Sequence, residues 1–105
     1  MGLPNIKGEL PVAITILDGQ TPVRLKQVIM QQLTVGQSMK TQSDLKADQW
    51  VGVGELAAMT HLVDESGKSY PLTYEALESS SRQNLGYLDN LRTQLDAKEQ
   101  AESLN

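Results

Sequence analysis

The sequence has no cysteine and no phenylalanine, and only one histidine and one tryptophan in 105 residues. The absence of cysteine excludes a disulfide framework and thiolate zinc sites, and it fits a reducing cytosol. With His61 as the single histidine, a metal site would depend on carboxylates, so we expect neither a metal nor a cofactor. The sequence has no apolar run near the ~20 residues that cross a bilayer, and its N-terminus lacks the layout of a signal peptide. These absences predict a soluble protein with no membrane partner.

The formal net charge of −4 is unevenly distributed along the chain. Residues 1–40 carry two acidic and four basic side chains, whereas residues 41–105 carry eleven acidic and five basic ones. The second part is therefore acidic and has no basic stripe. Because such a surface is repelled by a phosphate backbone, nucleic-acid binding is not expected.

Alternating apolar residues predict a β-hairpin near the N-terminus. The alternation begins at Leu10, and one face of this strand is expected to carry Leu10, Val12, Ile14 and Ile16. Asp18-Gly19 is typical of a hairpin turn, because glycine tolerates a positive φ. A second strand is predicted from about Thr21 to Met30. Its alternation slips near Gln27, which a β-bulge or burial on both faces would explain.

Helices are predicted after this hairpin. Thr34 and Gln37 have the spacing of a capping box, in which each side chain bonds the backbone of the other residue, and they predict the start of a first helix. A second helix is predicted from about Asp48, although two glycines lower its helix propensity. One stripe of this second helix is expected to be Trp50, Val53 and Ala57.

The remaining segments predict one or two further helices. A short β-hairpin of Thr60–Val63 with Lys68–Leu72 is an open alternative for the segment before them. Thr73 is a predicted N-cap, flanked by two leucines in the positions of a hydrophobic staple. Three serines at 79–81 predict a break, and a final helix is predicted over about Arg82–Lys98.

Together these segments predict a single small α+β domain over residues 10–99, with an N-terminal β-hairpin followed by three or four short α-helices. Residues 1–9 are predicted to form a flexible N-terminal arm, and residues 100–105 a frayed C-terminal tail. A chain of this length buries roughly 65% of its unfolded surface. The core is therefore small, and burial against a partner would add to it.

Two glycine motifs resemble phosphate-binding sequences but lack the required context. Gly52–Ala57 has the spacing of a dinucleotide-binding turn, yet no adequate strand precedes it and Glu55 would place a carboxylate beside the phosphates. Gly67–Ser69 resembles the end of a P-loop, but a proline follows where a helix is needed. Close helix packing and a surface turn are the expected roles. The serines at 79–81 have no identifiable base, so an enzyme is not expected.

The predicted final helix carries a stripe of leucines at spacings of 3, 3 and 4 from Leu85. In one interpretation this stripe covers the core of its own domain. In the other, part of the stripe docks into a partner helix or receives one. Under the second interpretation the partner-binding residues are Tyr87, Leu88, Leu91 and Leu95.

The order and spacing of these segments resemble those of the small tail assembly chaperones of contractile-tailed phages, the family that includes those of Mu-like and P2-like phages. The resemblance covers roughly residues 10–95. It rests on the strand pair and on three short motifs: Leu10–Met30, then Thr34-Val35-Gly36-Gln37, then Leu56-Ala57-Ala58-Met59-Thr60, then Leu72-Thr73-Tyr74-Glu75-Ala76-Leu77. The chain departs from the pattern at residues 31–33, where an Arg-Glu-Pro-like triplet is common, and at Gln37, where Asp is usual.

The resemblance implies a non-enzymatic protein of phage or prophage tail morphogenesis. Such a protein binds the long helical tape measure protein in the bacterial host cytoplasm and keeps it soluble while tail tube subunits assemble. The tail tube protein is a second candidate partner, and a longer frameshifted product is a further property of the family. The alternative function is a minor structural or connector protein of the tail. Homo-oligomerisation stays open, because an unpaired hairpin edge can add a strand across a dimer.

Overall fold

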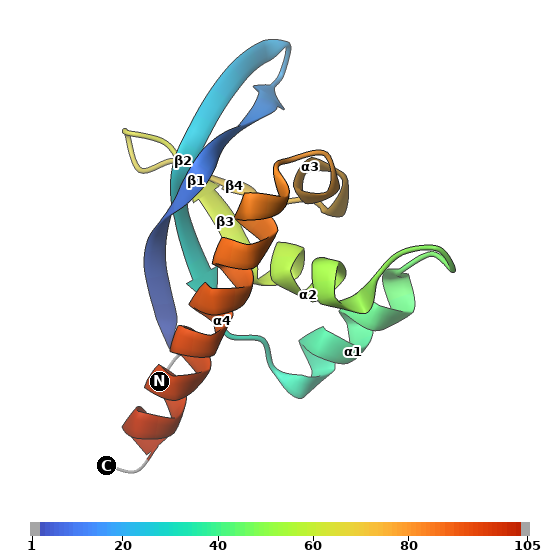
Figure 1. Cartoon of the computed structure of the whole chain (residues 1–105), viewed down its shortest axis with the longest axis vertical. Helices are drawn as coiled ribbons and strands as arrows, with labels where there is room; N and C mark the ends of the chain where they lie inside the picture. The colour runs from blue at the N-terminus through green and yellow to red at the C-terminus, as the bar shows by residue number, and fades with distance from the viewer. Residues whose placement is uncertain (1–2, 104–105) are drawn as a thin grey trace.

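A computed structural model, which describes residues 3–103, shows the predicted hairpin as two long antiparallel strands (Figure 1). These are β1 (Asn5–Asp18) and β2 (Thr21–Gln31). Gly19 occupies the first central position of the turn between them, with a φ of 64°. A type II′ hairpin turn has glycine at this position, because other residues pay a steric cost at positive φ.

The strand β1 begins at Asn5, five residues before the predicted start. Residues 5–9 pair in register with residues 27–31 of β2, so the predicted flexible arm is wrong for this segment. Its order comes from pairing with a distant strand, which the weak local periodicity of residues 5–9 did not reveal. Residues 1–2 of the predicted arm lie outside the described residues.

The predicted slip in the alternation of β2 coincides with a bulge in β1. The register shifts between Glu9 and Ile14, so that residues 10–13 of β1 oppose a single residue of β2. At the same point the buried side chains of β2 change from odd to even positions, with Leu25 and then Val28 facing the core. A bulge bends a strand and increases its twist, and Figure 1 shows the hairpin curving away from the rest of the sheet.

Two helices and a second hairpin follow. The helix α1 (Val35–Asp44) begins with the predicted capping box, and the helix α2 (Val51–Met59) begins three residues later than predicted. The strands β3 (Thr60–Val63) and β4 (Ser69–Pro71) form the short hairpin that the sequence left as an alternative. Because β3 pairs with β2, the sheet has four antiparallel strands in the order β1-β2-β3-β4.

The helix α3 (Tyr74–Glu78) has Thr73 as its N-cap, as predicted, and α4 (Arg82–Ser103) follows the predicted break at the three serines. The predicted fraying is wrong for residues 100–103, which continue α4; residues 104–105 lie outside the described residues. Alanine, glutamate and glutamine, which favour helix, fill this last turn. Within residues 3–103, no helix has the length and apolar character needed to cross a membrane.

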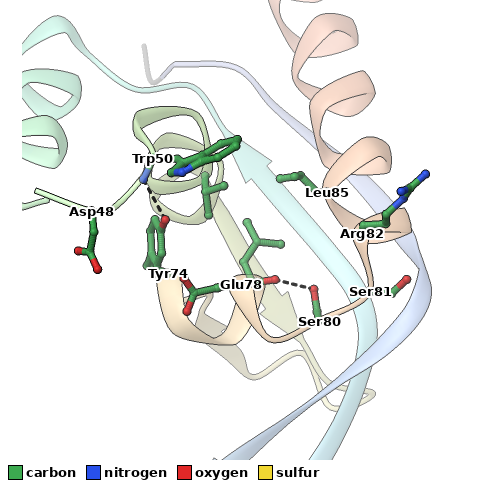
Figure 2. Close-up of a pocket in the computed structure, with 10 residues that line it drawn as sticks. Asp48, Trp50, Tyr74, Glu78, Ser80, Ser81, Arg82 and Leu85 are labelled. Carbon is green, nitrogen blue, oxygen red and sulfur yellow. Dashed lines mark hydrogen bonds between the residues drawn. The ribbon is translucent and has the colours of Figure 1, made fainter. Parts of the chain in front are cut away.

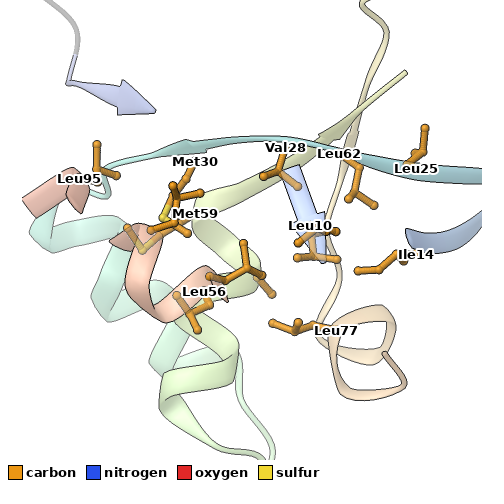
Figure 3. Close-up of a cluster of buried hydrophobic side chains, with 14 residues drawn as sticks. Leu10, Ile14, Leu25, Val28, Met30, Leu56, Met59, Leu62, Leu77 and Leu95 are labelled. Atoms are coloured by element: carbon orange, nitrogen blue, oxygen red, sulfur yellow. The ribbon is translucent and has the colours of Figure 1, made fainter. Parts of the chain in front are cut away.

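The helices α2 and α4 pack on one face of the sheet and enclose an aliphatic core (Figure 3). The mixed α+β fold predicted from the sequence is confirmed, with four helices and an additional pair of strands. The core consists of side chains from β1, β2, β3, the loop before α3, and three of the helices: Leu10, Ile14, Leu25, Val28, Met30, Leu56, Ala57, Met59, Leu62, Leu72, Leu77, Leu88, Leu91 and Leu95.

Candidate functional site

The predicted partner-binding residues on α4 lie mainly in the core. Leu88 and Leu95 are 0% exposed and Leu91 is 3% exposed, which favours the interpretation that this stripe covers the sheet. Tyr87 is half-buried beside β1, where its hydroxyl accepts a hydrogen bond from the backbone N–H of Glu9 at 2.9 Å. A partner would reach the three leucines only if α4 left the sheet.

The two glycine motifs have structural roles in the fold. Gly52–Ala57 lies within α2 rather than between a strand and a helix. Its second glycine, Gly54, is buried, and a Cβ there would lie 2.8 Å from Cδ2 of Leu45. Close packing therefore explains Gly54, whereas a Cβ at Gly52 would meet nothing within 4 Å. Gly67 lies in the turn between β3 and β4 with a φ of 91°, so the P-loop-like motif is part of a surface turn.

The histidine and the serines that were weighed as reactive groups are dispersed. His61 is exposed on β3, on the sheet face opposite the core. The hydroxyl of Ser80 donates to the carbonyl oxygen of Leu77, and that of Ser81 accepts from the backbone N–H of Gln83. Among residues 3–103, no three His, Asp or Glu side chains lie close enough together to hold a metal ion.

Exposed apolar side chains occur at the start of α2 and along α1. Trp50 is 74% exposed and the adjacent Val51 is 45% exposed, while Val35 and Met39 of α1 are 78% and 66% exposed. The prediction that Trp50 lies on a helical stripe with Val53 and Ala57 is wrong, because Trp50 precedes the helix. The helix begins after Trp50, which occupies the N-cap position and lines a groove on the surface.

Trp50 stands beside an open groove between α2, α3 and α4. Two adjoining hollows of about 270 and 450 Å³ form this groove, and both are lined by Trp50, Val53, Arg82 and Leu85. We call it the α2–α4 groove. Its apolar lining comprises Trp50, Val53, Leu56, Leu77 and Leu85. Figure 2 shows the smaller hollow, with the indole of Trp50 on one side and Leu85 of α4 across from it.

A hydrogen bond joins two of the residues that line this groove. The backbone N–H of Trp50 donates to the hydroxyl of Tyr74 at 2.9 Å (Figure 2). Tyr74 is the first residue of α3 and Trp50 precedes the first residue of α2, so this bond ties the starts of the two helices together. The hydrogen bond fixes only the backbone of Trp50, and its indole stays largely uncovered.

Charged side chains surround the apolar lining. Asp48, Glu78 and Arg82 line the smaller hollow, and none of them has an ion-pair partner within the part of the chain that the structure describes. At the far end of the larger hollow Arg92 forms a salt bridge with Asp89. The groove therefore combines an apolar floor with uncompensated charges, the arrangement found at the rims of protein interfaces.

A polar cluster ties the far end of the first hairpin to the second. Lys68 donates to Asp18 at 3.0 Å, and the hydroxyl of Tyr70 lies 3.2 Å from Asp18 and 3.3 Å from Asp64. The hydrogen bond from Lys68 lowers the pKa of Asp18, and the same contact raises the pKa of Lys68. The pKa of Asp64 is lowered mainly by its hydrogen bond from Ser66, and desolvation is the main cause that raises the pKa of Tyr70. These shifts follow from the hydrogen bonds and burial of a polar cluster that joins the two hairpins.

The unpaired edge of β1 is covered by side chains of α4. The side-chain amide of Asn84, which is 0% exposed, accepts from the backbone N–H of Val12 at 3.0 Å and donates to its carbonyl oxygen at 2.9 Å. The hydroxyl of Tyr87 accepts a hydrogen bond from the backbone N–H of Glu9, and the ammonium group of Lys98 donates one to the carbonyl oxygen of Asn5. Strand addition at this edge would have to displace all of these bonds. Asn84 was not predicted; the signal in the sequence is a polar residue four positions before Leu88 on the leucine stripe.

No protein-family model, no curated protein and no solved structure matches this chain. Its function must therefore be inferred from its own sequence pattern and geometry.

Proposed function

We propose that this protein is a tail assembly chaperone of a contractile-tailed phage or prophage, which binds the tape measure protein and keeps it soluble in the host cytoplasm. One observation carries the proposal: the only tryptophan is 74% exposed beside an open apolar groove. The resemblance in the order of segments supplies the choice of client.

A holding protein needs reversible apolar contacts and a charged exterior. The α2–α4 groove offers the first, because exposed apolar patches rimmed by polar groups are typical of protein-interaction sites. The net charge of −4 offers the second, because like charge opposes association between complexes. Binding a client's apolar helices also competes with their aggregation by mass action. No chemical step is part of this role.

Co-expression with the tape measure protein of the same phage or prophage tests the proposal. We expect the soluble fraction of the tape measure protein to rise and the two proteins to co-purify. Trp50→Ala should reduce both effects, because it removes the largest exposed apolar side chain of the groove. Leu17→Ala is the matched control, since Leu17 is 69% exposed but lies on the hairpin away from the groove. Unchanged solubility with the wild-type protein would refute the proposal.

Mass spectrometry of purified virions separates this role from that of a minor structural or connector protein. A chaperone is expected in infected cells and not in finished particles. Stoichiometric recovery of the chain from virions would favour the structural role instead.

A further inference from the structure

We propose that the α2–α4 groove accepts one amphipathic α-helix of the client, whose basic flank faces Asp48 and Glu78. This inference rests on the proposed function and adds the site, the secondary structure and the charge of the bound segment. It is carried by the shape of the groove, by two glycines on its walls and by its uncompensated charges.

The groove has the form of a seat for a helix. On α4 its lining follows one face of the helix from Arg82 through Leu85 and Asp89 to Arg92, a length of about 15 Å at 1.5 Å per residue. On the opposite wall α2 contributes Gly52, Val53 and Leu56, and Trp50 stands at the start of the helix. The hollows of about 270 and 450 Å³ hold a row of side chains rather than a whole helix of 10–12 Å diameter. The partner helix therefore lies across the opening and inserts its apolar stripe.

Each wall of the groove contains a helical glycine that the fold itself does not explain. Gly52 of α2 and Gly86 of α4 both line the larger hollow, and a Cβ at either position would meet nothing within 4 Å. Gly54 differs, because it makes room for Leu45. Glycine inside a helix costs about 1 kcal/mol relative to alanine, so an interior position such as Gly86 is unfavourable for the isolated domain. A partner backbone that approaches the two bare walls accounts for both glycines.

The charges around the groove select the polar flank of the partner. Two carboxylates, those of Asp48 and Glu78, and one guanidinium, that of Arg82, line the smaller hollow. Arg92 is already neutralised by Asp89. The excess is negative, so a helix with lysine or arginine beside its apolar stripe gains complementary contacts, whereas a helix with glutamate there meets repulsion.

Tryptophan fluorescence gives a direct test, because Trp50 is the only tryptophan and lines the groove. The probe is a synthetic amphipathic peptide of about 18 residues with a leucine stripe flanked by lysines; a matched peptide has glutamates in place of the lysines. Neither contains tryptophan. We expect the lysine peptide to shift the emission to shorter wavelength with saturation, and the glutamate peptide to bind at least about tenfold more weakly, which corresponds to 1.4 kcal/mol.

Two sets of variants assign the effect to the groove. Asp48→Asn with Glu78→Gln should remove the preference for the lysine peptide. Glu65→Gln with Glu102→Gln changes the net charge equally at exposed positions outside the groove and should retain the preference. If both double variants behave alike, the preference reflects net charge and the proposed recognition is wrong.

Substitution of Gly86 separates binding from folding. Gly86→Ala should leave Tm unchanged or raise it, and the larger side chain of Gly86→Leu should fill the groove. Both variants should bind the lysine peptide more weakly than the wild type, and for Gly86→Leu the loss of affinity should be about tenfold or more. Unchanged affinity of Gly86→Leu for the lysine peptide would overturn the proposal. An emission shift that depends only on protein concentration would also overturn it, because it would identify a second copy of the chain as the occupant.

If Gly86→Leu still solubilises the tape measure protein, the site is wrong while the chaperone role stands. If the wild-type protein does not solubilise it, the chaperone role itself fails.

Discussion

The helices α4 and α1 both carry an apolar stripe, but they use it differently. On α4 the stripe is covered by the sheet, and its buried residues are Asn84, Leu88, Leu91 and Leu95. On α1 none of the residues is buried, and Val35 and Met39, which lie four positions apart on one side of the helix, are 78% and 66% exposed. A capping box, packing on α2 and a hydrogen bond from Ser38 to Glu55 hold α1 in place. A stripe thus identifies the apolar face of a helix, while the topology determines what covers it.

The largest expected difference between the two helices is in the cost of truncating their apolar side chains. Leu88→Ala should lower the free energy of unfolding by about 2–5 kcal/mol, because it leaves a cavity in the core. Met39→Ala should change it by no more than about 0.5 kcal/mol, since Met39 is exposed. Urea unfolding of the two variants measures both values. Similar losses of unfolding free energy in the two variants would show that Met39 is covered in solution, and the contrast between α1 and α4 would be wrong.

The second test concerns the polar attachment of α4 to the bulge in β1. Asn84→Leu removes both hydrogen bonds to Val12, and each buried polar group that loses its partner costs about 1–3 kcal/mol. Asn84→Asp keeps the acceptor for the N–H of Val12 but loses the donor, so an intermediate loss is expected. Hydrogen exchange at the amide of Val12 should accelerate in the leucine variant. Unchanged exchange there would mean that this amide does not depend on Asn84.

The same interface can be tested from the side of the sheet. A Cβ at Gly8 would lie 2.3 Å from the hydroxyl oxygen of Tyr87 and 3.1 Å from Cδ2 of Leu91. Gly8→Ala should therefore destabilise the fold by about 1–3 kcal/mol through overpacking. Tyr87→Phe removes the hydroxyl, and in the double variant the loss should be smaller than the sum of the single losses. Additive losses would indicate that Gly8 is needed for another reason.

The smallest expected effect lies at the far end of the hairpin, which α4 does not cover. The pKa of Asp18 is below its ordinary value of 3.8, chiefly because of Lys68. Such a carboxylate stabilises the fold above pH 3.8, and this contribution is lost as the pH falls through the lowered pKa. Lys68→Met removes the cause, so its stability should fall less steeply than that of the wild type on acidification below about pH 5. The urea midpoints of the wild type and of Lys68→Met should therefore converge as the pH is lowered across this range. If the two midpoints fall in parallel with pH, Lys68 is not the cause of the lowered pKa of Asp18.

The locally encoded features were predictable from the sequence. The turn at Asp18-Gly19, the capping box at Thr34 and the N-cap at Thr73 each depend on a few neighbouring residues, and the structure confirms all three. The start of β1 at Asn5 was not predictable from periodicity, because distant strand pairing orders residues 5–9. The same limit explains why the end of α2 and the strand β3 were left as alternatives.

The candidate site was less predictable than the fold. Trp50 has the spacing of a buried stripe, but its exposure follows from where α2 begins and from the hydrogen bond to Tyr74. The groove needs residues from three helices, and no local pattern shows that Gly52 and Gly86 face the same hollow. Leucine spacing on α4 predicted a stripe whose residues Leu88, Leu91 and Leu95 lie in the core, while its first residue, Leu85, lines the groove. Periodicity therefore identified the face of α4 that packs on the sheet, whereas the groove depends on how three helices are arranged.

The side chains that α4 places along β1 also bear on behaviour at high concentration. A strand of 14 residues at the end of a sheet would ordinarily offer its main-chain groups to another molecule and seed stacked fibrils. Here an amide, a phenol and an ammonium group from one helix occupy several of those positions. Fewer main-chain groups at this edge of β1 are therefore left for a second strand to pair with, which disfavours fibril growth from this edge.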